Sequence, residues 1–271
     1  MTKSKCIFVT GAEHSGTRLL VEMFSKHPDL AVPTASMKAH GEFRPWNPFF
    51  VEVLDRTPLH SEDYVIDQEE LRFILDAYMQ SVDASKAWFV LKIPYHPLNC
   101  LDAFVDYFDG EISLVFTHRP PGKIFRSYQK RGEDRELFSE NSIEQLRHVK
   151  KLPVAQRYQH LAHPDAEAFF IALAEHCETL RERWDAAHPD RKFVVVDMET
   201  IATSKAYLVE LLEKLGVPVS GADAMMTVID TNRLLHHQPQ NSHRQRPSLK
   251  AVARGVPPPA IWNMAARLKK G

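Results

Sequence analysis

Short apolar runs alternate along the chain with longer segments in which apolar residues recur every three or four positions. Runs of the first kind predict buried strands, which we place at residues 5–10, 29–33, 87–93, 112–117 and 192–197. Segments of the second kind predict amphipathic helices, which we place at residues 17–26, 68–82, 100–108, 120–130, 167–187 and 204–215. This alternation predicts a three-layer α/β fold with a mostly parallel central sheet flanked by helices.

Length and composition favour one globular domain spanning residues 1–271, because 44% of the residues are hydrophobic and 25% are charged. A net charge of −1 gives no support to binding of nucleic acid or of an anionic membrane. No apolar stretch reaches the length of a membrane span, and the N-terminus lacks the apolar core of a signal peptide. Cys6, Cys100 and Cys177 are expected to be reduced thiols of a cytoplasmic protein, and their wide spacing predicts no metal site.

The first predicted strand ends at a turn with the sequence GAEHSGTR. Its Gly11 and Gly16 have the spacing of a phosphate-binding loop, G-x-x-x-x-G-K-[ST], whose backbone N–H groups bind anions. Thr17 occupies the position of the lysine, and Arg18 that of the magnesium-binding hydroxyl. With Ser15 as a further donor, the turn favours an anion less charged than a nucleoside triphosphate and bound without metal. The alternative is an ordinary strand-to-helix turn.

A second motif, THRPPGKIFRSY, follows the strand predicted at residues 112–117. Arg119 stands at the carboxyl end of this strand, and Ser127 lies eight residues further on, about two turns along a helix. An arginine and a hydroxyl in this arrangement can hold one phosphate from two sides. The other basic residues of this helix are interpreted as solvated: Lys123, Arg126, Lys130 and Arg131.

Open parallel sheets bind ligands at the carboxyl ends of their strands. The topology therefore predicts that three segments converge on one crevice, residues 11–18, 92–96 and 118–119.

Together these segments resemble the sulfotransferases that use 3′-phosphoadenosine 5′-phosphosulfate (PAPS), in particular the branch that modifies carbohydrates. GAEHSGTRLLVEMFSKHPDL resembles the family's 5′-phosphosulfate loop and the helix after it, and THRPPGKIFRSY resembles its 3′-phosphate motif. Three weaker likenesses are the third-strand segment FVLKIPYHP, the late strand and helix KFVVVDMETIATSKAYLVELLEKLGVP, and the nucleotide-covering loop NSHRQRP. Residues 34–86 and 133–170 show no such likeness.

The resemblance implies a P-loop NTPase-like fold, PAPS as the sulfuryl donor, PAP as its product, and no metal. It implies that the 5′-phosphosulfate is held by Gly11, His14, Ser15, Gly16, Thr17 and Arg18. The 3′-phosphate would be held by Arg119 and Ser127, and a flap carrying Arg244 or Arg246 would cover the nucleotide.

His14 departs from the family pattern, because many members have lysine, and some arginine, at this position. That side chain is thought to stabilise the bridging oxygen as PAP leaves. His14 can serve as an imidazolium or as a neutral N–H donor. The alternative is that His14 is a spectator and that Arg18 or Lys92 supplies the charge.

The acceptor, a carbohydrate or other small molecule with a hydroxyl or amine, must lose a proton during attack on sulfur. Three residues are candidates for the general base: Glu42 after the second strand, His96 near the end of the third, and His40. Lys92 is interpreted as an electrostatic partner of the transferring group. The aromatic residues beside Glu42, which are Phe43, Trp46, Phe49 and Phe50, form either an acceptor platform or part of the core.

Two other functions stay open from the residues alone. A small-molecule kinase with a P-loop would need a lysine at Thr17 and ligands for magnesium. A nucleotide-sensing module without turnover is favoured only by the change at His14.

Overall fold

A computed structural model describes residues 5–32, 46–59, 61–80, 85–93, 98, 100–109, 111–131, 151–158 and 166–237. Residues 1–233 form one compact unit, which contains all the strands, and residues 234–271 form a second. The expectation of a single domain spanning residues 1–271 stays a prediction.

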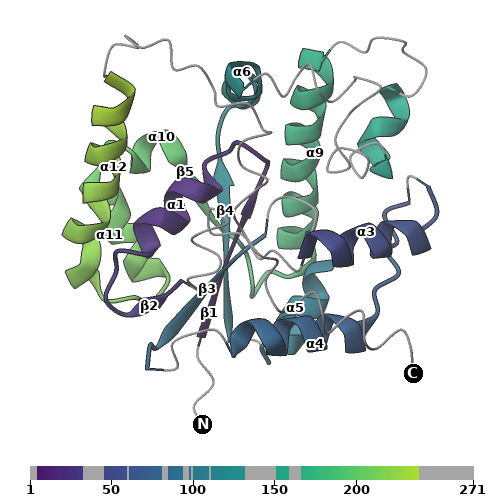
Figure 1. The fold of residues 1–271 in the computed structure, drawn as a ribbon, viewed down its shortest axis with the longest axis horizontal. Coiled ribbons are helices and arrows are strands. Elements are labelled where there is room, and N and C mark those ends of the chain that lie inside the picture. Colours follow the sequence, from purple (N-terminus) through teal and green to yellow (C-terminus); the bar gives the residue numbers. More distant parts are fainter. Residues whose placement is uncertain are drawn as a thin grey trace, which may run out of the picture. The chain divides into compact units, whose positions relative to one another are not determined.

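The core of the first unit is a five-stranded parallel sheet with the strand order β2-β3-β1-β4-β5 (Figure 1). Its strands are β1 (Lys5–Gly11), β2 (Leu30–Ala31), β3 (Trp88–Lys92), β4 (Ile112–His118) and β5 (Val194–Asp197). All five predicted strands are present, so the predicted α/β fold with a parallel sheet is confirmed. The edge strand β2 has two residues where the apolar pattern predicted five.

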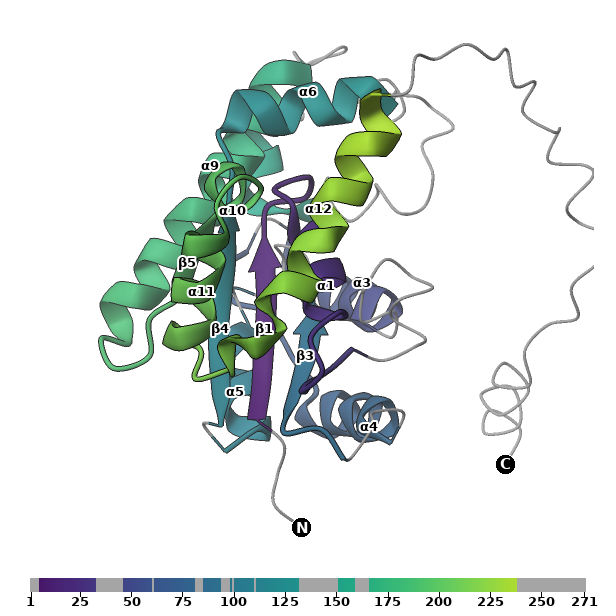
Figure 2. The same ribbon diagram turned by 90° about the vertical axis from the view of Figure 1, so that its left-hand side faces the viewer.

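Strand β1 is central, and both of its faces are buried. Ile7 and Val9 pack with one apolar cluster, while Cys6 and Phe8 pack with the other, as the alternation of side chains along a strand requires. Helices α1 (Thr17–Phe24), α11 (Lys205–Lys214) and α12 (Ala222–His237) cover the first face. The second face is covered by α3 (Trp46–Arg56), α4 (Gln68–Met79), α5 (Leu101–Tyr107), α6 (Pro121–Arg131) and α9 (Ala166–Ala187). The two views in Figures 1 and 2 show this three-layer arrangement.

The strand register brings the ends of three strands together. Gly11 of β1 pairs with Thr117 of β4, and Val9 pairs with Lys92 of β3. The carboxyl ends of β1, β3 and β4 are therefore adjacent. Residues 94–96 lie outside the described residues, so the common crevice stays a prediction. Helix α6 lies across this carboxyl edge of the sheet (Figure 2).

Several elements have no counterpart in the sequence prediction: α3, α12, the short helix α10 (Met198–Ile201), and the 3₁₀ turns η3 (Pro153–Tyr158) and η4 (Val219–Gly221). In α3, Phe49 and Phe50 are only 3% and 2% exposed, so these two rings are core residues and not an acceptor platform. Phe43 lies outside the described residues.

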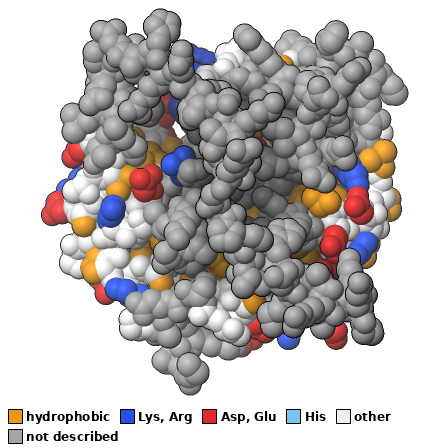
Figure 3. All heavy atoms as spheres, viewed as in Figure 1, with side chains coloured by type: hydrophobic (Ala, Val, Ile, Leu, Met, Phe, Trp, Pro, Cys, Tyr) orange, Lys and Arg blue, Asp and Glu red, His pale blue; other side chains and the backbone are white. Residues whose placement is uncertain are grey.

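The described surface is mixed in charge. On the face in Figure 3, acidic and basic side chains are interspersed over the described residues, in keeping with the near-neutral net charge. The described helices include none that is both long enough and apolar enough to span a bilayer. All three cysteines are free, as the sequence predicts, and all three are buried. Burial raises the pKa of each thiol.

Candidate active site

The turn between β1 and α1 is built around two glycines in the left-handed region. Gly11 has a φ of 150°, and a Cβ atom there would lie 2.3 Å from Thr117 Oγ1. Gly16, at the N-cap of α1, has a φ of 110°, and its Cβ would lie 2.9 Å from Met198 Cγ. Both positions therefore require glycine, because neighbouring segments approach the backbone closely.

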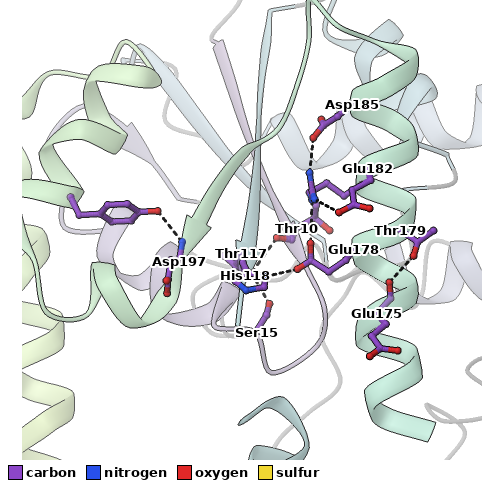
Figure 4. Close-up of polar contacts among 12 residues, drawn as sticks. Thr10, Ser15, Thr117, His118, Glu175, Glu178, Thr179, Glu182, Asp185 and Asp197 are labelled. Carbon is purple, nitrogen blue, oxygen red and sulfur yellow. Dashed lines mark hydrogen bonds and ion pairs between the residues drawn. The ribbon is translucent and has the colours of Figure 1, made fainter. Parts of the chain in front are cut away.

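Ser15 ties the turn to β4. Its hydroxyl shares a hydrogen bond of 2.6 Å with Thr117 Oγ1, and its backbone N–H donates to the carbonyl of Ala12 at 3.0 Å. Both hydroxyls are buried, Ser15 with 1% and Thr117 with 0% of its surface exposed. The loop is thus held in shape by the strand beside it (Figure 4).

The first turn of α1 offers donors to an anion. No side chain caps its N-terminus, and the first N–H groups of a helix have no partner within the helix itself. The helix dipole adds partial positive charge at the same end. Thr17 is buried here and Arg18 is exposed, so the guanidinium of Arg18 is accessible from solvent.

His14 joins the two predicted phosphate motifs. Its Nδ1 shares a hydrogen bond of 3.1 Å with Ser127 Oγ, and its carbonyl accepts one of 3.3 Å from Arg119 Nη1. Its backbone has a φ of 64°, an uncommon conformation for a residue with a side chain. Residues 113 and 105 positions away in the sequence therefore meet at this one turn.

Helix α6 is fixed in the orientation that presents Ser127 to the turn. The neighbouring Tyr128 lies against the ring of His14, with 4.1 Å between the ring centroids, and stacks on Phe170 of α9 at 3.9 Å. Its hydroxyl donates to Glu13 Oε2 at 3.3 Å. The sequence reasoning missed Tyr128 and Glu13. Their only signal was their position next to Ser127 and His14.

Comparison with known proteins shows the family of the chain. The family model described as "Sulfotransferase family" matches residues 6–221, a range that contains the whole of the geometry above. The chain belongs to the sulfotransferase family.

One solved structure agrees with this at the level of the fold. The sulfotransferase STF9 from Mycobacterium avium is similar with a TM-score of 0.50 and 14% identity, covering 88% of this chain and 70% of that one. The sulfotransferase domain of the olefin synthase from Synechococcus PCC 7002 has 14% identity and a TM-score of 0.47, covering 100% and 97%. Among curated proteins, no sequence matches significantly.

In this sulfotransferase, Lys92 ends β3 beside the turn. The residue is only 3% exposed and pairs in register with Val9. Of the basic residues interpreted as solvated, Arg126 and Lys130 are exposed. The side chain of Lys123 is 40% exposed and also forms an ion pair with Glu199, which links α6 to α10.

At the end of β5, Asp197 caps α10 by accepting from the backbone N–H of Glu199 at 2.8 Å and of Thr200 at 3.3 Å. The bond from Glu199 is the main reason that the pKa of the Asp197 carboxyl lies below its usual value.

Other predicted site residues lie outside the described part of the chain: Glu42, His96 and His40 as general bases, and Arg244 and Arg246 of the flap. Their roles stay predictions. Among the residues that are described, no group of three or more His, Cys, Asp or Glu side chains is placed to hold a metal ion.

Proposed function

We propose that this sulfotransferase moves a sulfuryl group from PAPS to a hydroxyl, or less readily an amine, of a carbohydrate or other small molecule. The observation that carries the proposal is the position of His14, in contact with both Ser127 and Arg119. A turn suited to a phosphosulfate and a pair suited to a second phosphate thus lie side by side, as a nucleotide with phosphates on both its 5′ and 3′ positions requires.

The 5′-phosphosulfate is proposed to lie on the turn from Gly11 to Arg18. Backbone N–H groups at the start of α1 donate to it, and Arg18 neutralises charge. A sulfuryl group carries less charge than a terminal phosphoryl, so the missing lysine and magnesium ligand are no obstacle. The 3′-phosphate is proposed to lie between Arg119 and Ser127.

In the proposed reaction, the acceptor oxygen attacks sulfur in line with the bond to the bridging oxygen. That bond breaks, and its electron pair leaves with PAP. His14 or Lys92 stabilises the charge that develops on the bridging oxygen. The acceptor proton passes to a general base, for which Glu42, His96 and His40 are the candidates.

Calorimetry with PAP in the presence of EDTA tests this function. The chain is expected to bind PAP without metal, and Arg119→Ala should weaken binding about tenfold or more, because a charge-assisted contact to phosphate is lost. Arg126→Ala is the matched control, since Arg126 lies on α6 and, among the described residues, its guanidinium bonds the Gly122 carbonyl of its own helix.

Binding of ATP with magnesium, and not of PAP, would instead support a kinase. Transfer of labelled sulfate from PAPS to a library of acceptors then separates an enzyme from a nucleotide sensor. A chain that binds PAP but transfers to no acceptor contradicts the proposed activity.

We also propose a cytoplasmic location, which the three free thiols support. In the proposed enzyme the whole chain acts as one catalytic domain, with Arg244 or Arg246 closing over the nucleotide.

A further inference from the structure

Helix α9 contacts the end of β4 through two side chains on one face of the strand. Nδ1 of His118 donates to Glu178 Oε1 at 2.6 Å. Two residues earlier on the strand, the ring of Phe116 lies 5.7 Å below the guanidinium of Arg181. Residues two apart on a strand share a face, as do residues three apart on a helix. The strand and the helix thus meet along one face of each, and Figure 4 shows the contact of His118 with Glu178.

Both oxygens of the Glu178 carboxylate are engaged. Oε1 accepts from His118, and Oε2 accepts from Arg181 Nε at 3.2 Å. Arg181 is itself held by Asp185 at 2.7 Å and by Glu182 at 3.1 Å. The acceptor for His118 is therefore fixed in place, because a carboxylate bonded on both sides has little freedom to rotate.

The opposite face of the strand end is held as well. Thr117 shares its hydrogen bond with Ser15 and donates to the carbonyl of Thr10 at 3.3 Å. The last two residues of β4, Thr117 and His118, are thus held by hydrogen bonds on opposite faces of the strand. The next residue in the chain is Arg119.

The same helix supports the other half of the proposed 3′-phosphate pair. Phe170 of α9 stacks on Tyr128 and lies 6.2 Å from the ring of Phe125, and both of these residues flank Ser127 on α6. One helix therefore holds the segment that carries Arg119 and the segment that carries Ser127.

We propose that Glu178 is a positioning residue for the donor. Through His118 it fixes the backbone from which Arg119 extends, and so sets the separation of Arg119 and Ser127 that the 3′-phosphate needs. This inference rests on the proposed function. Glu178 itself touches no ligand, and its effect on binding passes through the geometry of Arg119.

The solvent exposure of His118 and Glu178 is consistent with a positioning role. The side chains of His118 and Glu178 are 40% and 26% exposed, and ion pairs open to solvent contribute little to folding stability. A bidentate contact between arginine and phosphate depends strongly on direction. The pair is therefore expected to affect affinity for the 3′-phosphate far more than resistance to unfolding.

The test compares two ligands, PAP and adenosine 5′-monophosphate, which lacks the 3′-phosphate. Calorimetry on the full chain measures the affinity for each ligand. The proteins compared are the wild type, Glu178→Ala, Glu178→Gln and Glu182→Ala. Glu178→Ala should weaken the binding of PAP about tenfold and change the affinity for the monophosphate by less than about twofold. Glu178→Gln keeps an oxygen that accepts from His118, so it should retain PAP affinity within about threefold.

Glu182→Ala is the matched control, because Glu182 also bonds Arg181 on α9 but has no bond to His118. It should leave both affinities unchanged. The inference is overturned if Glu178→Ala lowers the affinity for both ligands equally or for neither. It is also overturned if Glu182→Ala lowers the affinity for PAP as much as Glu178→Ala does. None of these results contradicts the proposed function. A wild-type chain that fails to bind PAP overturns the proposed function, and the inference falls with it.

Thermal unfolding of each variant shows whether it folds. If Glu178→Ala does not fold, the same comparison is made between His118→Leu and His118→Asn, whose amide keeps a donor near the position of Nδ1. Leucine should lose PAP affinity selectively and asparagine should retain it; equal behaviour of the two overturns the inference.

Discussion

At the scale of single residues, His14 joins the two predicted phosphate motifs of this sulfotransferase. Its ring bonds Ser127, its carbonyl accepts from Arg119, and its backbone is in the left-handed region. A residue held in an uncommon conformation by several contacts is typical of functional sites. The resemblance to the family aligns this histidine with a position at which many members have lysine and some have arginine.

His14→Ala is predicted to lower turnover much more than donor affinity. A contact to the leaving group strengthens in the transition state, so its loss reduces kcat, here by about 100-fold, the size seen when one stabilising donor is removed. Steady-state kinetics with PAPS and calorimetry with PAP measure the two quantities. His14→Lys, which restores the common family residue, should keep turnover; unchanged kcat in His14→Ala would remove the residue from the mechanism.

Gly11→Ala is predicted to lower the free energy of unfolding by about 1–3 kcal/mol, the cost of a strained backbone. The added methyl meets Thr117 Oγ1 at 2.3 Å, in a backbone with a φ of 150°. Denaturant unfolding provides the measurement. Gly122→Ala on α6 is the control, because nothing lies within 4 Å of its Cβ position. Its effect should stay within about 1 kcal/mol, and a Gly11→Ala variant equally stable would contradict the packing at the turn.

At the scale of elements, the short helix α10 supports the turn from the side. Met198 lies where a side chain at Gly16 would clash, and Glu199 pairs with Lys123 of α6. Four residues cannot form a stable helix alone, so α10 depends on its cap. That cap is Asp197, which also pairs in register with His118 at the end of β4.

Asp197→Ala is predicted to lower the free energy of unfolding by about 1 kcal/mol at pH 7, as the loss of an N-cap does. The pKa of Asp197 is lowered in the folded state. Its contribution is therefore full above the ordinary aspartate pKa of about 3.9, and it is lost as the pH falls through the lower, folded value. Denaturant unfolding at pH 7 and at an acid pH below about 3.9 should show a smaller difference between the two proteins at the lower pH.

A difference between wild type and Asp197→Ala that is the same at both pH values would argue against this carboxylate as the cap. Asp67→Ala provides the comparison at another helix, because Asp67 caps α4 in the same way but lies outside the site. Both variants should lose stability, and only Asp197→Ala should also weaken binding of PAP.

At the scale of the whole molecule, the sheet separates two apolar clusters and carries the site at its carboxyl edge. The site draws on β1, β4, α1, α6 and α9, which are far apart in the sequence. A ligand bound there contacts segments from both layers. Ligand binding and global unfolding should therefore be coupled.

PAP is predicted to raise the midpoint of thermal unfolding without magnesium. At a concentration of about 100 times Kd, a ligand specific for the folded state adds about 2.7 kcal/mol. Differential scanning fluorimetry with EDTA and with magnesium should give the same shift, and Arg119→Ala should reduce it. A shift that requires magnesium would speak for a nucleoside triphosphate instead of PAP.

Much of the architecture was readable from the sequence, because strands buried on both faces must be apolar and helices on a sheet must be amphipathic. That is why all five strands were found, with shifts at their ends, and so were the helices α1, α4, α5, α6, α9 and α11. Helix α3 was missed because its aromatic residues also suited a binding platform, and only the burial of Phe49 and Phe50 decides between the two. The sequence pattern predicts no helix for the segment that forms α12.

The sequence by itself determined the sheet and the glycine turn, and it predicted that Arg119 and Ser127 act together, since each depends on local pattern or short spacing. Only the tertiary structure decided what joins them. The contact of His14 with Ser127, the hold of Glu178 on His118 and the packing of Met198 against Gly16 each link residues that are distant in the chain. Such contacts follow from how layers pack on the sheet, and no local pattern of residues encodes them.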